Sequence, residues 1–127
     1  MTTDTLRPLV DILKALAHPV RLRILALLRD GELCVCEVAE VLGLAPSTVS
    51  EHLTDLRRTG LVRERKMGRW VHVALSDEAA ARPVLESLWP LMAAAEAELG
   101  RDLAQARTLR CEACTPTDCS ALISAQP

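Results

Sequence analysis

The chain has 127 residues, half of them apolar and a quarter charged, which are the proportions of one compact globular domain. No apolar run approaches the roughly 20 residues that a membrane helix needs, and the first eleven residues lack the apolar centre of a signal peptide, so we expect a cytoplasmic protein with no membrane partner. The formal net charge is −2, which taken alone argues against a nucleic-acid partner.

The positive charge is nevertheless concentrated in one segment. Residues 55–75 contain six basic and two acidic side chains, whereas acidic residues outnumber basic ones on either side. Trp70 and Trp89 are the only residues of the Phe, Trp and Tyr class, and modules that bind RNA or single strands need such rings to stack on bases. The composition therefore excludes those modules and leaves duplex DNA as a partner.

Four helices are predicted in the first half of the chain. Apolar residues recur at helical spacing over residues 6–17, 22–28, 35–42 and 46–58. The predicted breaks between and after them contain Pro19, Gly31, Gly43 and Gly60. Because only residues 43–45 separate the third helix from the fourth, this pair has the spacing of a helix-turn-helix.

After residue 60 the spacing of the apolar residues is no longer helical. Residues 61–65 and 70–75 are β-prone and flank residues 66–69, where Gly68 can adopt a positive φ, so we predict a hairpin. Residues 76–78, Ser-Asp-Glu, have the composition of a helix start.

One apolar stripe then continues to about Arg110, and we expect Pro90 and Gly100 to kink or interrupt it. The predicted order is four helices, two strands and a helix. This is a mainly α (α+β) winged helix-turn-helix over residues 1–110, followed by a cysteine-containing tail over residues 111–127.

Five cysteines in a reducing compartment indicate metal binding or thiol chemistry, not a disulfide framework. They form two groups: Cys34 and Cys36, and Cys111, Cys114 and Cys119. Residues two apart lie about 200° around a helix, so the first two thiols can converge only where the backbone is not yet helical or is unwound by a ligand. Thiols at a helix N-terminus also form thiolates readily.

Three stretches in this order resemble the ArsR/SmtB family of metal-sensing repressors, most of all its arsenic-repressor branch. They are ELCVCEV at residues 32–38, STVSEHL at 47–53 and GRWVH at 68–72. The resemblance extends from about Asp11 to Leu75, and more loosely through the last helix. It implies a repressor that binds its own operator as a homodimer and is released by a thiophilic ion. Long apolar stripes on the first and last helices also favour a dimer joined through them.

The fourth helix is the predicted recognition helix. If Val49, Leu53 and Leu56 face inward, helical geometry places Ser47 and Thr48 outward. The resemblance places four side chains at DNA: Ser47, Thr48, Ser50 and His52. Charge alone predicts phosphate contacts for Arg57 and, in the hairpin, for Arg65, Lys66 and Arg69.

The ion site departs from the family pattern. Arsenic-type members often have a third cysteine three residues after the second, and this chain has Ala39 there. As(III), the expected inducer, favours three thiolates. Three arrangements stay open: a joint site of Cys34, Cys36 and one tail cysteine from either subunit, a separate site of Cys111, Cys114 and Cys119, or a four-thiolate site for Cd(II), Pb(II) or Zn(II). The last helix has no histidine, which excludes the Asp and His zinc site of other members.

Other functional classes are also compatible with parts of the sequence. A thiol reductase using Cys111 and Cys114 would need a βαβ scaffold that the chain lacks, and no other catalytic arrangement is visible, so we expect no enzyme. A repressor of the same fold that responds to oxidation of Cys34 and Cys36 remains an alternative. A tail that is merely reactive, or a constitutive DNA-packing protein, also stays open.

Overall fold

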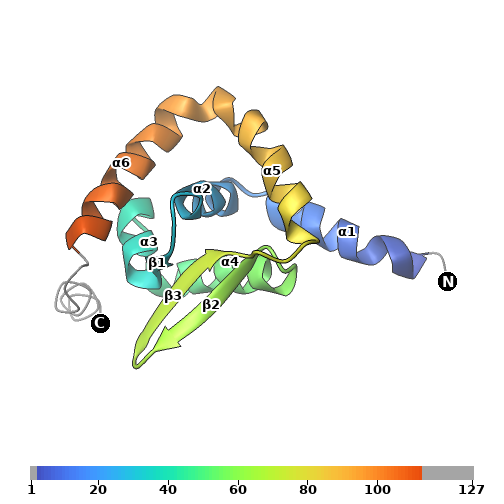
Figure 1. Ribbon diagram of the computed structural model, residues 1–127, viewed down its shortest axis with the longest axis horizontal. Helices are drawn as coiled ribbons and strands as arrows, with labels where there is room; N and C mark the ends of the chain where they lie inside the picture. The colour runs from blue at the N-terminus through green and yellow to red at the C-terminus, as the bar shows by residue number, and fades with distance from the viewer. Residues whose placement is uncertain (1–2, 113–127) are drawn as a thin grey trace.

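The computed structural model describes the backbone of residues 3–112, and the side chains of all of these except residues 3–5, 96 and 110–112 (Figure 1). In chain order its elements are α1 (Thr3–Leu16), α2 (Pro19–Leu28), β1 (Leu33–Cys34), α3 (Val35–Leu42), α4 (Pro46–Arg58), β2 (Val62–Met67), β3 (Trp70–Leu75), α5 (Ala81–Met92), the 3₁₀ turn η1 (Ala93–Ala95) and α6 (Glu96–Glu112). The four expected N-terminal helices and the hairpin are confirmed, in the order of a winged helix-turn-helix.

Local signals in the sequence explain where the first helices begin and end. His18 is the extended N-cap of α2, its Nδ1 accepting from the Val20 backbone N–H at 3.1 Å, and Pro19 occupies the first helical position. Gly43 ends α3 with a φ of +67°, a left-handed conformation that glycine adopts without strain. The chain therefore turns within three residues from α3 into α4.

The sheet has three antiparallel strands in the order β1-β3-β2. The strand β1 is not predicted from the sequence, because two residues are too few to show a period-two pattern. β1 pairs Leu33 with Val73 and Cys34 with His72, both on β3. β3 has the predicted bounds, whereas β2 begins at Val62 and runs two residues beyond its predicted end, since Met67 pairs with Trp70 and leaves a two-residue turn.

The predicted helix start at residues 76–78 is wrong, and α5 begins at Ala81. The Ser76 N–H donates to the Leu61 carbonyl and continues the sheet contact. The Ser76 hydroxyl accepts from the Glu78 N–H at 3.2 Å, so it stabilises a local turn and not the first turn of a helix.

The last apolar stripe forms two helices, α5 and α6, joined by η1, so the interruption expected near Pro90 is confirmed and the one expected at Gly100 is wrong. Pro90 lies inside α5, near its end, where it lacks an N–H for the helical ladder. Gly100 lies within α6 and does not interrupt it, and α6 runs to Glu112, two residues past the expected tail boundary. The two helices form an arch over α2 (Figure 1).

The core surrounds α2. Ile24, Leu25 and Leu27 are fully buried and pack with apolar side chains of α3, α4, the hairpin, α5 and α6. A charged pair lies at the edge of the core. Arg23 of α2 donates two hydrogen bonds, of 2.9 and 3.0 Å, to the buried carboxylate of Asp102 on α6. This bidentate contact fixes α6 against α2.

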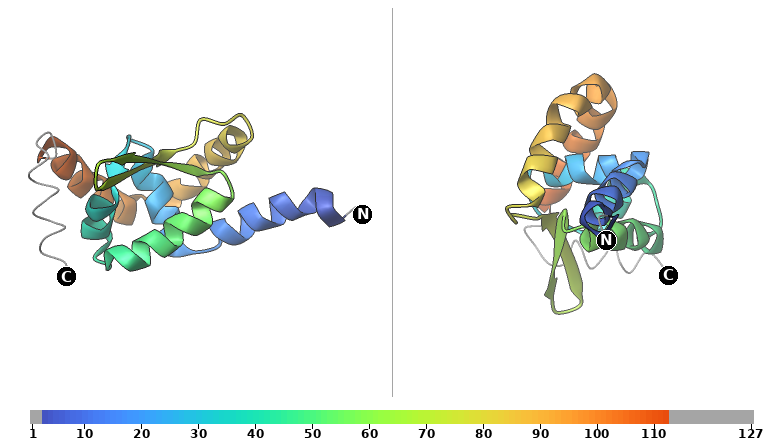
Figure 2. Two further views of the ribbon diagram at one scale, coloured as in Figure 1. Left: turned by 90° about the horizontal axis from the view of Figure 1, so that it is seen from below. Right: turned by 90° about the vertical axis from the view of Figure 1, so that its right-hand side faces the viewer.

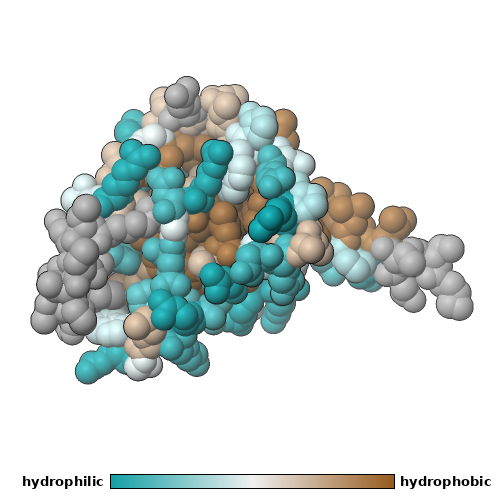
Figure 3. Space-filling view, in the orientation of Figure 1, coloured by the Kyte–Doolittle hydropathy of each residue, from teal (hydrophilic) through white to brown (hydrophobic). Residues whose placement is uncertain are grey.

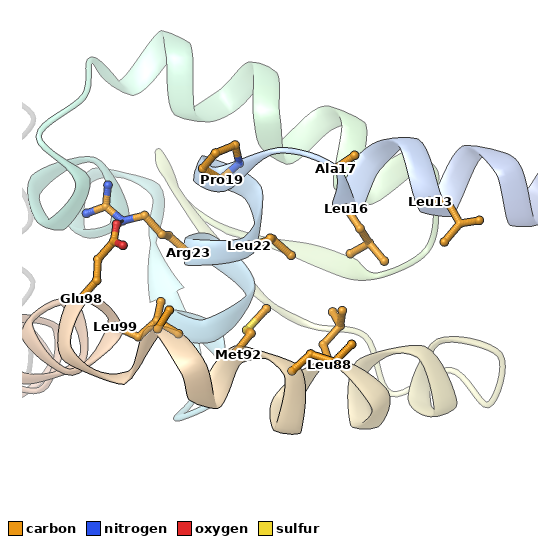
Figure 4. Close-up of a pocket in the computed structure, with 12 residues that line it drawn as sticks. Leu13, Leu16, Ala17, Pro19, Leu22, Arg23, Leu88, Met92, Glu98 and Leu99 are labelled. Carbon is orange, nitrogen blue, oxygen red and sulfur yellow. Dashed lines mark ion pairs between the residues drawn. The ribbon is translucent and has the colours of Figure 1, made fainter.

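α1 extends beyond the rest of the molecule and carries hydrophobic residues to the surface (Figures 2 and 3). Leu6, Leu9 and Leu13 are between 50% and 59% exposed. Next to them a groove of about 490 Å³ is lined by side chains of α1, α2, α5, the adjoining η1 turn and α6, with Arg23 and Glu98 at one end (Figure 4). No helix in the described part of the chain is long and apolar enough to cross a bilayer.

Candidate functional site

The helix α4 presents a short polar face beside the hairpin. Val49, Leu53 and Leu56 are buried, as the spacing requires, while Ser47 and Ser50 are exposed and Thr48 is half-buried. Small hydroxyl side chains let a helix approach base edges closely in the major groove. The exposed start of α4 therefore has the shape and the chemistry of a recognition helix.

His52 lies on the inner side of this face. Its Nδ1 accepts from Nε of Arg21 at 3.3 Å, and its ring centroid is 4.5 Å from that of His18. Arg21 also pairs with Asp55 at 2.7 Å, so these four side chains join the start of α2 to the middle of α4. Burial, then the charges of His18 and Arg21, lowers the pKa of His52.

The hairpin carries an exposed row of cations. Arg63, Lys66 and Arg69 are exposed, and Gly68 takes the positive φ of +64° that its tight turn needs. Hydrophilic residues predominate along the lower edge of Figure 3, where the hairpin lies, with a small apolar area at its tip. Duplex DNA lying along α4 would bring its phosphates to this row.

The two other arginines predicted to contact phosphates form ion pairs with carboxylates of the protein itself. Arg57, at the end of α4, forms an ion pair with Glu64 of β2. Arg65 donates two hydrogen bonds to Glu32, with Nη2 to Oε1 at 2.5 Å and Nε to Oε2 at 3.2 Å. The hydrogen bond from Arg65 lowers the pKa of Glu32. Both arginines remain about half exposed, so each can also face a phosphate.

The structure places Cys34 and Cys36 together. Cys34 is the N-cap of α3, with extended dihedrals of φ −74° and ψ 147°, and Cys36 lies in the first helical turn. The change from extended to helical backbone turns both side chains to one side, and their Sγ atoms are 2.8 Å apart. Both residues are buried, with 2% and 3% of their surface exposed.

Glu37 fixes this junction of strand and helix. Its Oε1 accepts from the Cys34 N–H at 2.7 Å, as in a capping box, and the side chain is buried. The spacing of Cys34 and Glu37 is that of an N-cap and its third helical residue, so the sequence contained this signal. From the sequence, Glu37 is evident only as a neighbour of the thiols, and its capping role is not predicted.

Trp70 is the other contact that sequence reasoning missed. It packs on the buried pair of Cys34 and Cys36, as the one partly buried hydrophobic side chain assigned to their cluster among the described residues. Trp70 begins β3, two residues before His72, whose partner across the sheet is Cys34. No regular signal in the sequence reveals such a contact, because β1 is needed to bring the two segments together.

The donor set at this junction is soft and incomplete. Two thiols 2.8 Å apart can bind one thiophilic ion through both sulfurs. Within the described residues no group of three or more His, Cys, Asp or Glu side chains has the geometry of a metal site. The side chain of Cys111 and all of Cys114 and Cys119 lie outside the described residues. The backbone of Cys111 is in the last turn of α6, a helix that packs against α2 and α3 (Figure 1).

Comparison with known proteins identifies the fold and its family. The model of the family described as bacterial regulatory protein, arsR family, matches residues 18–64. The arsenical resistance operon repressor of Escherichia coli (strain K12) is 40% identical over 83 residues, which are 63% of this chain and 71% of that protein. Matches to other curated relatives span 53% and 58% of their length.

Solved structures show the same architecture. HlyU from Vibrio cholerae N16961 is 40% identical with a TM-score of 0.62, and the match covers 72% of this chain and 97% of that one. The homodimeric winged helix-turn-helix DNA-binding domain of Mb0332 from Mycobacterium bovis is 28% identical with a TM-score of 0.64, over 75% of this chain and 85% of that one. The chain belongs to the ArsR family of winged helix-turn-helix transcriptional repressors.

Proposed function

We propose that this protein binds operator DNA as a homodimer and is released when a thiophilic ion, As(III) in the first place, binds the thiolates of Cys34 and Cys36. The observation that carries the proposal is the pair of Sγ atoms 2.8 Å apart at the N-terminus of α3. α3 is the first helix of the helix-turn-helix, so a ligand there acts directly on the element that positions α4.

The DNA surface combines α4 and the hairpin. Ser47, Thr48 and Ser50 contact base edges or phosphates from the start of α4. Lys66 and Arg69 at the hairpin turn, with Arg57 and Arg65 nearer the body, contact phosphates. His52 supports α4 through Arg21, which is a different role from the DNA contact that the family resemblance implies.

As(III) needs a third thiolate, and the arrangement of helices supports a donor from the tail. α6 packs against α3, which at eight residues is only about 12 Å long, so the chain leaves α6 close to the cysteine pair. We therefore favour a joint site of Cys34 and Cys36 with Cys111, Cys114 or Cys119. A fourth thiolate from the same set would instead suit Cd(II), Pb(II) or Zn(II).

Ion binding acts on DNA affinity through the shape of the junction. Two thiolates on a tetrahedral zinc ion lie about 3.8 Å apart, given Zn–S bonds near 2.3 Å. The present separation of 2.8 Å must therefore widen, and Cys34 lies in the strand while Cys36 lies in the helix. Widening the pair moves α3 relative to β1, and this movement changes the angle at which α4 meets the groove.

Fluorescence anisotropy of a labelled fragment of the gene's own promoter tests the proposal. Reduced protein is bound at fixed salt, and arsenite, Cd(II) and Zn(II) are titrated in parallel. We expect release by arsenite near one equivalent per subunit, no release from Cys34→Ser or Cys36→Ser, and a weakened response in one of the tail variants Cys111→Ser, Cys114→Ser and Cys119→Ser. Tight DNA binding that no ion alters would overturn the ion-sensing function and retain the repressor.

The closeness of the two sulfurs also favours a second candidate, a repressor that responds to oxidation. A hydroperoxide oxidises one thiol to a sulfenic acid and leaves as an alcohol, or as water in the case of hydrogen peroxide; the second thiol then displaces the sulfenic oxygen as water and forms the disulfide between Cys34 and Cys36, so that each departing oxygen takes up one thiol proton. Thiol titration before and after mild peroxide separates the candidates. An ion sensor keeps its DNA affinity as long as it is reduced and ion-free, whereas an oxidant sensor loses affinity together with two titratable thiols.

A further inference from the structure

We propose that Trp70 is the positioning residue through which occupancy of the Cys34 and Cys36 pair reaches the hairpin. This inference rests on the proposed ion site and assigns the part of the chain that transmits its effect. It concerns a side chain that is neither an ion ligand nor a phosphate contact.

The first support is the packing of the thiol pair. Cys34 and Cys36 form a small buried cluster separate from the main core, and Trp70 is packed against it. Protein interiors are densely packed, so atoms around a widening pair of sulfurs have to move. The indole is a large, flat group, and it transfers such a displacement to the strand that carries it.

The second support is the position of Trp70 in the hairpin. It is the first residue of β3 and pairs with Met67 across the turn, and the guanidinium of Arg69 lies 5.8 Å from the centre of its ring. Trp70 therefore packs against the thiol pair and also lies next to a proposed phosphate contact. A shift of the indole moves the turn that is to meet the DNA backbone.

The third support is that β1 is attached to the hairpin close to this contact. Cys34 pairs with His72 of β3, and residues two apart on a strand share a face, so Trp70 and His72 lie on the same side of the sheet. Glu32, just before β1, binds Arg65 of β2. These contacts anchor β1 to the middle of the hairpin, which leaves the turn as the part that the indole can displace.

The test measures the ratio of the DNA dissociation constants with and without arsenite, because a change in basal affinity alone does not alter this ratio. We expect Trp70→Ala to reduce the ratio by about tenfold and Trp70→Phe, which keeps a flat ring, to restore most of it. Trp89→Phe is the matched control. Trp89 is a residue of α5, away from the thiols, and the guanidinium of Arg29 lies over its ring. Arsenite binding is followed independently by the ultraviolet absorbance of the arsenic–thiolate bonds.

Tryptophan fluorescence gives a second readout that does not involve DNA. In Trp89→Phe, where Trp70 is the remaining indole, arsenite is expected to change the emission at one equivalent, whereas Trp70→Phe shows no such change. An unaltered ratio in Trp70→Ala that still binds arsenite would overturn this inference alone. A wild-type protein that binds arsenite without any change in DNA affinity would overturn the proposed function and this inference together.

Discussion

His52 shows how a single side chain connects the recognition helix to pH. It accepts from Arg21, and its ring lies tilted against that of His18. Burial, followed by the charges of these two neighbours, lowers its pKa below the ordinary 6.5, while Asp55 and Glu51 act in the opposite direction. The folded protein therefore disfavours protonated His52. The stability that this histidine contributes is present above its unfolded pKa and is lost as the pH falls through that value towards the folded pKa.

We expect the free energy of unfolding, measured by urea titration, to decrease as the pH is lowered from about 7.5 to 5.5. His52→Gln, which keeps an acceptor for Arg21, should make this decrease smaller. His72→Gln is the matched control because it removes a histidine of β3 that lies beside Glu32 and not in this cluster. An unchanged pH dependence in His52→Gln would show that His52 does not contribute to it.

The ion pair of Asp102 with Arg23 holds helix α6 against helix α2. Its carboxylate is 6% exposed and accepts two hydrogen bonds from Arg23, which raise the pKa of the arginine. Asp102→Asn removes the charge and one acceptor while α2 and α6 keep their apolar contacts. Hydrogen bonds to charged groups contribute about 2 kcal/mol, so we expect a loss of this size in the free energy of unfolding. Asp77→Asn, at an exposed loop position, should change it by less than about 0.5 kcal/mol.

At the scale of elements, we propose that the hairpin supplies the electrostatic part of DNA binding. Each phosphate contact that is lost makes the dependence of log K on log salt shallower by about 0.9, so Lys66→Ala with Arg69→Ala should reduce the slope by about 2. Affinity should fall equally for operator and unrelated duplexes, because phosphate contacts carry no sequence information. Arg82→Ala, which removes an exposed cation from α5, is the control. A double variant with the wild-type slope would exclude the hairpin from the interface.

Elements with a strong local signal could be predicted from the sequence, and those defined by tertiary contacts could not. The four N-terminal helices and the hairpin follow from apolar periods and from glycines at their ends. The strand β1 exists because Leu33 and Cys34 pair with β3, which no local pattern reveals. Residues 76–78 mimic a helix N-cap, but Ser76 is held by the sheet and the helix starts later.

The same distinction applies to the site. The spacing of Cys34 and Cys36 required a non-helical residue for convergence, and Cys34 has that extended conformation. Trp70 and Arg21 act through partners far away in the chain, so their contacts with the thiols and with His52 emerged only from the fold. The tail cysteines stay a prediction, since the side chain of Cys111 and all of Cys114 and Cys119 lie outside the described residues.

At the scale of the whole molecule, α1 is explained best by a second copy of the chain. Leu9 and Leu13 are 50% and 56% exposed on a helix that extends from the body, next to an apolar groove between α1, α2, α5 and α6 (Figure 4). Exposed apolar surface of this kind marks an interface. A symmetric dimer also presents two α4 helices to successive major grooves, so loss of the dimer and loss of operator affinity should occur together.

We expect Leu9→Glu with Leu13→Glu to sediment as a monomer and to bind a palindromic operator about a hundredfold more weakly or worse, because each half-site is then bound without the gain from a second linked subunit. The control is Met67→Glu, which places the same charge at a comparably exposed apolar residue of the hairpin and should leave the protein dimeric. Arsenite binding to the monomer should persist if all three thiolates come from one chain, and should weaken sharply if a tail cysteine crosses to the other subunit. A double variant that still sediments as a dimer would show that the subunits associate through another surface, and α1 would then need a different partner.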